Sequence, residues 1–234
     1  MSNAAFFAAI RPLFGGALSQ SQVDGVNHIL SATKGLPKSY RAYLLATTHH
    51  ETAKTMMPVR ETLASTDKAA VARLEKAWKD GKLKWVKTPY WRFDKDGKTW
   101  LGRGYVQLTH KANYQKAGKL IGVDLVSNPN AAMVPQIAAK VLVDGSVQGI
   151  FTGKRLGDYL PGDYVGARRV INGTDKAETI AGLARGYDAA LNHFDYDEPD
   201  TPAPVAPSPT NPNPLAAFFA ALARILSSIF GGKS

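Results

Sequence analysis

Two glutamates ten residues apart, Glu51 and Glu61, are the side chains of this sequence best suited to catalysis. Leu44, Thr47 and Glu51 follow one another at helical spacing, so Glu51 is expected on a core-facing side of a helix, where burial raises a carboxyl pKa. Glu61 is expected in a loop, where it stays ionised. A protonated and an ionised carboxyl form the pair that hydrolyses glycosidic bonds, although most glutamate pairs at this spacing are surface residues.

Motifs for other chemistries are incomplete. His50-Glu51 resembles the start of a zinc-binding HExxH helix, but Lys54 stands where the second histidine belongs. The stretch from Asp94 resembles a calcium loop, but Tyr105 occupies the position of the last glutamate ligand. The chain has no cysteine, which excludes disulfides and thiolate nucleophiles. We therefore expect no metal and no cofactor.

The chain is strongly basic, with a formal net charge of +10. Residues 51–111 contain all four tryptophans and a marked excess of lysine and arginine over acids. A field of this sign attracts polyanions, including nucleic acid, anionic membranes and the bacterial wall. Aromatic rings stack on sugars as well as on bases, so this basic, aromatic stretch suits an anionic glycan. The alternative, that the tryptophans pack a small core, stays open.

The elements that must position these residues are mainly helical. Ser39 is suited to cap a helix that begins at Tyr40 and carries Glu51. Residues 135–151 predict a helix that starts on a proline, and residues 175–192 predict another with acidic residues near its start.

A small β-hairpin region is expected between the glutamates and these later helices. Asp96-Gly97 is typical of a tight hairpin turn. In the following residues 101–110, strand alternation would place Tyr105, Gln107 and Thr109 on one face.

The C-terminal part changes character. Residues 197–214 hold seven of the 14 prolines and predict an extended linker. Residues 215–234 predict an amphipathic helix with one apolar stripe. Two interpretations of residues 215–230 stay open, contact with an anionic membrane or packing against protein. The N-terminus lacks the pattern of a secretion signal, and no stretch is long and apolar enough to span a membrane.

Several motifs together resemble glycoside hydrolase family 19, the family of plant class I chitinases and of many phage and prophage endolysins. The resemblance runs from about residue 10 to residue 192. The motifs are His50-Glu51-Thr52, Glu61, Gly102-Arg103-Gly104-Tyr105-Val106-Gln107-Leu108-Thr109, Asn113-Tyr114, Ile121-Gly122-Val123-Asp124-Leu125 with Asn128-Pro129, and Ile171-Asn172-Gly173.

The resemblance implies roles for individual residues. Glu51 matches the general acid, and Glu61 matches the general base that activates water with inversion at the anomeric carbon. Thr109 would help to hold that water. Arg185 lies near the place of a helical arginine that pairs with the acid site. The implied substrate-binding residues are His50, Tyr105, Gln107, Asn113, Asn172 and Arg185.

The resemblance also implies a mainly α, lysozyme-like, two-lobed fold with a small β-hairpin region for residues 1–196, in addition to the C-terminal amphipathic helix. The short chain between the two glutamates favours peptidoglycan over chitin. We therefore expect an endolysin that cuts β-1,4 bonds of peptidoglycan. Chitinase activity and a non-catalytic glycan- or membrane-binding role are the alternatives. A monomer that binds no nucleic acid is expected, held in the host cytoplasm until its release to the cell wall.

Overall fold

The computed structural model describes residues 3–195. The predicted linker (197–214) and C-terminal helix (215–234) lie outside the described residues. Within residues 3–195, no helix is long and apolar enough to cross a membrane.

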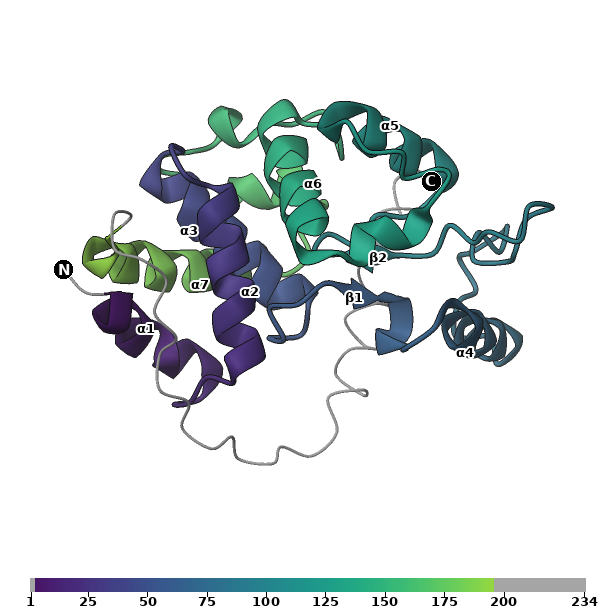
Figure 1. Cartoon of the computed structure of the whole chain (residues 1–234), viewed down its shortest axis with the longest axis horizontal. Coiled ribbons are helices and arrows are strands. Elements are labelled where there is room, and N and C mark those ends of the chain that lie inside the picture. The colour runs from purple at the N-terminus through teal and green to yellow at the C-terminus, as the bar shows by residue number, and fades with distance from the viewer. Residues whose placement is uncertain (1–2, 196–234) are drawn as a thin grey trace.

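Seven α-helices, six short 3-10 helices and a two-stranded antiparallel sheet make up most of the described part (Figure 1). This confirms the predicted mainly helical fold with a small sheet, which is the lysozyme-like arrangement. The elements are α1 (Asn3–Ile10), α2 (Gln20–Ala32), α3 (Lys38–Glu51), β1 (Val59–Arg60), α4 (Asp67–Lys79), β2 (Arg103–Gly104), α5 (Lys111–Ile121), α6 (Pro135–Gln148) and α7 (Ala177–Ala190).

Helix α3 lies at the centre of the main body, against α2 and α7, and α1 and α6 complete the same core (Figure 1). Its side chains from Ala42 to His49 are all buried, as in a helix surrounded by protein. Because α3 runs through the core, its last residue, Glu51, ends inside the protein with only 4 % of its surface exposed.

A second, smaller core surrounds α4 at the opposite end of the molecule (Figure 1). Trp91, which is fully buried, is its largest member and packs with Leu74, Leu83 and Leu101. Trp78 and Trp85 pack against this core partly exposed. Most of the tryptophans therefore build a lobe, as the alternative interpretation of the aromatic stretch held. A third cluster joins α5 to the outer side of α6, so α6 contributes to two cores.

Two local predictions were wrong. Helix α3 starts at Lys38, before the predicted start at Tyr40. Its N-cap residue is Pro37 and not Ser39, and no side chain caps the helix. Asp96-Gly97 does form a turn, and the backbone amide of Asp94 closes it by donating a hydrogen bond to the carbonyl of Lys98. No strands flank this turn. The sheet instead pairs β1 with β2, far apart in the sequence.

Strand alternation in residues 101–110 was also wrong. Only Arg103–Gly104 is strand, and Arg103 exchanges backbone hydrogen bonds with Leu108 across a tight loop. Gln107 has a φ of 52°, a left-handed conformation that breaks the two-residue repeat. Tyr105 consequently points into the main core, while Gln107 and Thr109 stay partly exposed.

Candidate active site

Glu51 is one half of a buried ion pair. Nη1 of Arg168, in the short helix Gly166–Val170, donates to Oε1 of Glu51 at 2.7 Å. The Arg168 side chain is fully buried, and its Nε donates to the backbone oxygen of Asp175. Removing one member of such a pair leaves an uncompensated charge in the core, so each fixes the other in place.

The prediction that Arg185 pairs with the acid site was wrong. Arg185 lies on the exposed side of α7, and its nearest acidic partner is Glu178 at 3.8 Å. The arginine that reaches Glu51 comes from the segment just before Ile171-Asn172-Gly173, because α7 faces α3 with its apolar side.

Buried polar atoms surround Glu51. His50 Nε2, Arg168 Nη2 and Asp175 Oδ2 are buried and have no hydrogen-bond partner among residues 3–195. Burial lowers the pKa of His50 and so favours its neutral imidazole. Buried polar atoms are rarely left unpaired, so this cluster has the capacity to bind a polar ligand. A substrate-binding role for His50 stays a prediction.

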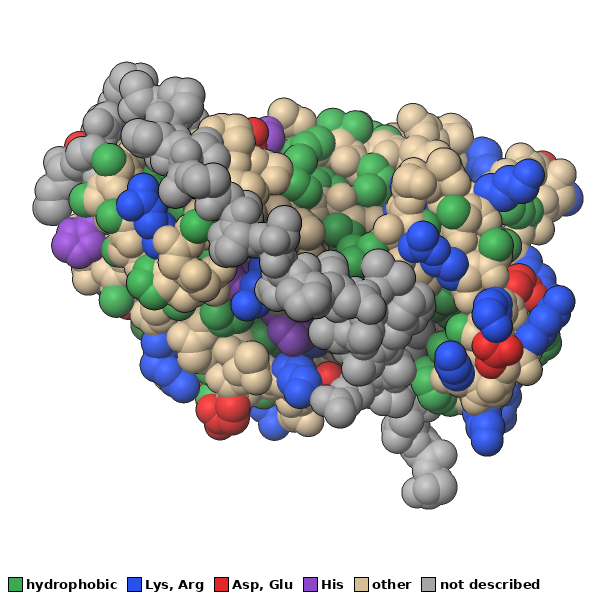
Figure 2. Space-filling view, turned by 90° about the horizontal axis from the view of Figure 1, so that it is seen from below, with side chains coloured by type: hydrophobic (Ala, Val, Ile, Leu, Met, Phe, Trp, Pro, Cys, Tyr) green, Lys and Arg blue, Asp and Glu red, His purple; other side chains and the backbone are tan. Residues whose placement is uncertain are grey.

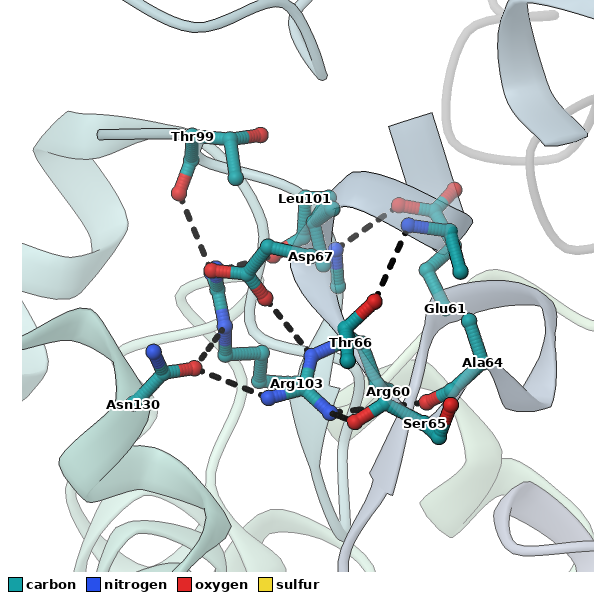
Figure 3. Close-up of polar contacts among 12 residues, drawn as sticks. Arg60, Glu61, Ala64, Ser65, Thr66, Asp67, Thr99, Leu101, Arg103 and Asn130 are labelled. Atoms are coloured by element: carbon teal, nitrogen blue, oxygen red, sulfur yellow. Dashed lines mark hydrogen bonds and ion pairs between the residues drawn. The ribbon is translucent and has the colours of Figure 1, made fainter. Parts of the chain in front are cut away.

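Glu61 is the first residue after β1, opens the short 3-10 helix Glu61–Leu63 and is 2 % exposed, so the predicted loop position was wrong. Its Oε2 accepts from the amide of Gly102 at 2.7 Å, and its Oε1 accepts from the hydroxyl of Tyr90 at 2.7 Å. Burial raises the pKa of Glu61, while these two hydrogen bonds and the charge of Arg103 oppose the rise. Figure 3 shows Glu61 beside the residues of β1 and β2.

The backbone after Glu61 is strained. Thr62 has a φ of 62° and Leu63 a φ of 53°, although neither is glycine and Thr62 is β-branched. The surroundings hold this conformation: the backbone amide of Glu61 donates to the Gly102 carbonyl at 2.8 Å, and Arg73 Nη1 donates to the Thr62 carbonyl at 2.8 Å. Strain of this kind persists where the surrounding structure fixes a residue, and here it fixes the direction of Glu61.

A pocket of about 310 Å³ lies between α5, the end of α6 and the loop that carries Asn172. It is lined by Val106, Gln107, Leu108, Thr109, His110, Asn113, Lys116, Ile150, Phe151, Thr152, Ile171, Asn172 and Gly173. Four of the predicted site residues therefore meet in one pocket: Gln107, Thr109, Asn113 and Asn172.

The pocket adjoins the partners of both glutamates without being lined by either carboxylate. The ring of His110 lies 4.8 Å from that of Tyr90, which donates to Glu61. On the other side, the backbone amide of Asn172 donates to the Arg168 carbonyl, and Arg168 holds Glu51. The residues that line the pocket therefore contact one partner of each carboxylate.

Hydrogen bonds orient the polar groups of the pocket. Gln107 Nε2 donates to the Val59 carbonyl at 2.9 Å, which leaves its buried Oε1 without a partner among the described residues. Thr109 Oγ1 donates to the Gln107 carbonyl at 2.6 Å, and Asn113 Nδ2 donates to the Thr109 carbonyl at 2.8 Å. With its proton committed, the Thr109 hydroxyl keeps lone pairs that can accept from a water molecule.

Tyr105 does not join the pocket. It is fully buried in the main core, and burial raises the pKa of its hydroxyl. In this position it has no surface to offer to a substrate, so its predicted binding role was wrong. Its place beside the GRG turn is a packing role.

Sequence reasoning missed three residues: Arg168, Tyr90 and Lys116. Arg168 is 117 positions from Glu51, a separation at which no local pattern gives the pairing. Tyr90 was part of the aromatic stretch, but nothing marked its hydroxyl as the partner of Glu61. Lys116 lines the pocket and donates to the Ile150 carbonyl at 2.9 Å, and it follows Asn113 by one helical step. Among residues 3–195, no three potential metal ligands cluster.

Comparisons with known proteins match this part of the chain. The family model described as class I chitinase, glycoside hydrolase family 19, matches residues 35–143, which include both glutamates and the GRG turn. "Chitinase 11" of Oryza sativa subsp. japonica is 50 % identical over 40 residues, 17 % of this chain and 16 % of that protein. "Basic endochitinase" of Vitis vinifera is 53 % identical over 34 residues, 14 % and 11 % of the two chains. The matched segments thus span less than a fifth of either relative. Residues 35–143, a little under half of the chain, thus match glycoside hydrolase family 19.

Proposed function

We propose that this protein is an endolysin that hydrolyses β-1,4 glycosidic bonds of peptidoglycan, with Glu51 as general acid and Glu61 as general base. The observation that carries the proposal is that two buried, individually held carboxylates each have a hydrogen-bond partner in contact with residues of one amide-lined pocket. Glycoside hydrolysis needs two such carboxyls in different surroundings. The roles of the two follow the family resemblance.

In the proposed reaction, Glu61 accepts a proton from a water molecule while the water oxygen attacks the anomeric carbon. Glu51, in its protonated form, gives its proton to the leaving glycosidic oxygen, and the configuration inverts. Thr109 accepts a hydrogen bond from the attacking water, which its committed hydroxyl proton allows. Gln107 and Asn172 offer amide groups to the sugar from the pocket wall. The hydrogen bonds from Gly102 and Tyr90 favour the ionised Glu61 that a base must present.

The charge of the pocket supports peptidoglycan as substrate. No Asp or Glu lines it, and Lys116 brings an ammonium group to its wall. Chitin is uncharged, whereas peptidoglycan carries carboxylates on its muramic acid or peptide portion. A cation in the pocket therefore favours the wall polymer by opposite-charge attraction, an effect that operates mainly on specificity and encounter.

Chitinase activity is the second candidate, because the family model and both relatives bear chitinase names. Initial rates on purified peptidoglycan and on chitin oligomers separate the two. Lys116→Met is expected to lower the rate on peptidoglycan several-fold and to leave the chitin rate unchanged. Lys119→Met, on the same helix but outside the pocket, is the matched control. Chitin cleavage with no release from peptidoglycan would assign a chitinase instead.

The roles of the two glutamates can be separated chemically. A glycoside with a highly activated leaving group needs no proton from an acid, so Glu51→Gln should retain activity on it while losing activity on the natural polymer. Glu61→Gly should lose activity on both and regain it with added azide, which replaces the water that the base would activate. The opposite pattern would exchange the two roles.

The proposed place of action is the cell wall, reached from the host cytoplasm during lysis by a monomeric enzyme. Lysis of cells from outside and after expression inside, with and without permeabilisation of the inner membrane, tests this. Lysis from inside only after permeabilisation is the expected result.

A further inference from the structure

A cluster of charged side chains lies beside Glu61 (Figure 3). Arg103 is fully buried, and its Nη2 donates to Asp67 Oδ2 at 2.6 Å. Arg60, with 12 % of its side chain exposed, donates from Nε to Asp67 Oδ1 at 2.6 Å. Asn130 Oδ1 accepts from both arginines, at 2.9 Å from Arg60 and 3.2 Å from Arg103. One carboxylate therefore bridges two guanidinium groups.

Other acceptors complete the shell around the two arginines. Arg103 Nη1 also donates to the carbonyls of Thr99 and Leu101 and to the Tyr114 hydroxyl at 2.8 Å. Arg60 Nη1 donates to the Ser65 carbonyl at 2.9 Å. A guanidinium with this many acceptors is fixed in position as well as compensated in charge.

The cluster carries an excess positive charge. Arg60 and Arg103 bring two positive charges and Asp67 brings one negative charge, which leaves +1. Glu61 has no direct ion pair among the described residues, because its two oxygens accept from the neutral donors Gly102 and Tyr90. With an ionised Glu61 included, the buried group is neutral. This compensation offsets only part of the cost of burying an ionised Glu61, because burial still raises its pKa.

The backbone ties this cluster to Glu61. Arg60 and Arg103 are partners across the β1–β2 ladder, so like charges face each other there, an arrangement that is unfavourable without Asp67 between them. Glu61 directly follows Arg60, and Gly102, its hydrogen-bond donor, directly precedes Arg103. A shift of either arginine would therefore move the donor or the acceptor of the Glu61 hydrogen bond.

We propose that Arg60, Asp67 and Arg103 act as one positioning cluster, in which the excess positive charge favours the ionised form of Glu61 and the fixed arginines keep it correctly aimed in its buried site. The inference rests on the proposed role of Glu61. None of the three cluster residues contacts the pocket, so they act through Glu61 and leave substrate binding to other residues.

Other groups also face Glu61 and its immediate neighbours. Tyr90 donates to it and has its own hydroxyl pKa raised by burial and by the charge of Glu61. Tyr114 lies behind Arg103, His110 packs on Tyr90, and Arg73 binds the Thr62 carbonyl. Arg103 is the one of these charged groups that opposes the burial-driven rise in the pKa of Glu61.

The test uses two substitutions of opposite sign in the full-length protein. Asp67→Asn removes the negative charge and should move the acidic limb of the kcat/KM profile to lower pH, by about 0.5 to 1 unit. Arg103→Gln removes a positive charge and should move that limb to higher pH by a similar amount, with kcat falling more than KM changes. Arg103→Lys restores the charge and should return the limb toward its original place.

The matched control breaks another arginine–carboxylate pair of the same lobe. Arg92 Nε donates to Glu75 Oε1 at 2.7 Å on the surface, and Glu75→Gln should leave the limb unmoved. If Arg103→Gln does not fold, as circular dichroism would reveal, Asp67→Asn carries the test. An acidic limb of Asp67→Asn that coincides with that of wild type, with Glu61→Gln inactive, would overturn the inference alone. If Glu61→Gln were active, the proposed role of Glu61 as general base would be wrong, and the inference that rests on it would fall with it.

Discussion

At the scale of single residues, the candidate active site contains groups that lower the stability of the fold. Glu61 is buried with its pKa raised, Thr62 holds a left-handed backbone, and several polar atoms around Glu51 have no partner among the described residues. Each feature costs folding free energy. Natural enzymes commonly accept such costs at the positions that act on substrate.

Glu61→Gln should therefore gain stability as it loses activity. A group whose pKa is raised by folding contributes stability that is present below its unfolded pKa, 4.5 for glutamate, and is lost as the pH rises through the folded pKa. Glutamine does not titrate and escapes this loss. Thermal unfolding at pH 7 should show a higher Tm for Glu61→Gln than for wild type, and the two should converge below pH 4.5. A lower Tm at pH 7 would mean that Glu61 stabilises the fold.

Sequence reasoning reached some of these residues and not others. The helical spacing correctly predicted that Glu51 is buried, because the spacing of apolar residues reports which side of a helix faces the core. It did not predict the burial of Glu61, since that depends on pairing between β1 and β2 across a long sequence separation. The interaction of Arg168 with Glu51 also joins residues far apart in the sequence, so the sequence pattern did not predict it.

At the scale of elements, the contact between α3 and α7 supports the Glu51 site. Near the end of α3, His49 is 2 % exposed and its Nδ1 shares a hydrogen bond with the Tyr187 hydroxyl at 2.9 Å. Burial, followed by the charges of Lys54 and His50, lowers the pKa of His49 from 6.5 to about 4. The histidine is thus neutral in the folded protein at neutral pH.

This histidine should make the fold sensitive to acid. Between pH 6.5 and about 4, the unfolded state binds more protons at His49 than the folded state, so stability falls as the pH falls through this window. The full effect is about 3 kcal/mol. Urea unfolding at pH 7 and pH 4.5 should show a smaller loss for His49→Gln than for wild type. Equal losses would assign the acid sensitivity to other groups.

Two helical glycines form a matched pair for testing the packing of α2. A Cβ on Gly25 would lie 1.8 Å from the Met56 carbonyl oxygen, in the segment that connects Glu51 to Glu61, whereas a Cβ on Gly182 in α7 meets nothing within 4 Å. Gly25→Ala should lower stability by about 1–3 kcal/mol and reduce activity. Gly182→Ala should raise stability by about 0.5–1 kcal/mol with activity unchanged. Tolerance of Gly25→Ala would show that this segment can move freely.

The elements differ in how well the sequence predicts them. Helices α6 and α7 lie within the predicted ranges, with the proline of α6 at its first position as expected. Residues 101–110 were assigned the wrong periodicity because Gln107 and His110 adopt positive φ values without being glycine. Tertiary contacts impose those conformations, and no local pattern in the sequence reveals them.

At the scale of the whole molecule, positive charge gathers at the end that carries α4 (Figure 2). Several exposed lysines there have no ion pair among the described residues. They are Lys68, Lys79, Lys82, Lys84 and Lys87. Such a surface speeds the encounter with an anionic polymer and does so less at high salt.

Lytic rate on peptidoglycan should therefore fall steeply between low and physiological salt, while cleavage of uncharged chitin oligomers should change little. Lys82→Glu should lower the rate on peptidoglycan and flatten its salt dependence. Lys34→Glu makes the same charge change in the turn between α2 and α3, away from the α4 lobe, and should have a smaller effect. Equal effects of the two substitutions would mean that net charge, and no particular surface, governs the rate.

The central claim is that a pair of buried glutamates cuts the glycan of peptidoglycan. Its most direct test is a digest of purified peptidoglycan by wild type and by Glu51→Gln, with mass spectrometry of the released fragments. The account predicts new reducing ends from wild type and none from Glu51→Gln, and the terminal sugar identifies the bond that is cut. Equal release by both proteins would contradict the role of Glu51, and absence of new ends with wild type would contradict cleavage of this polymer.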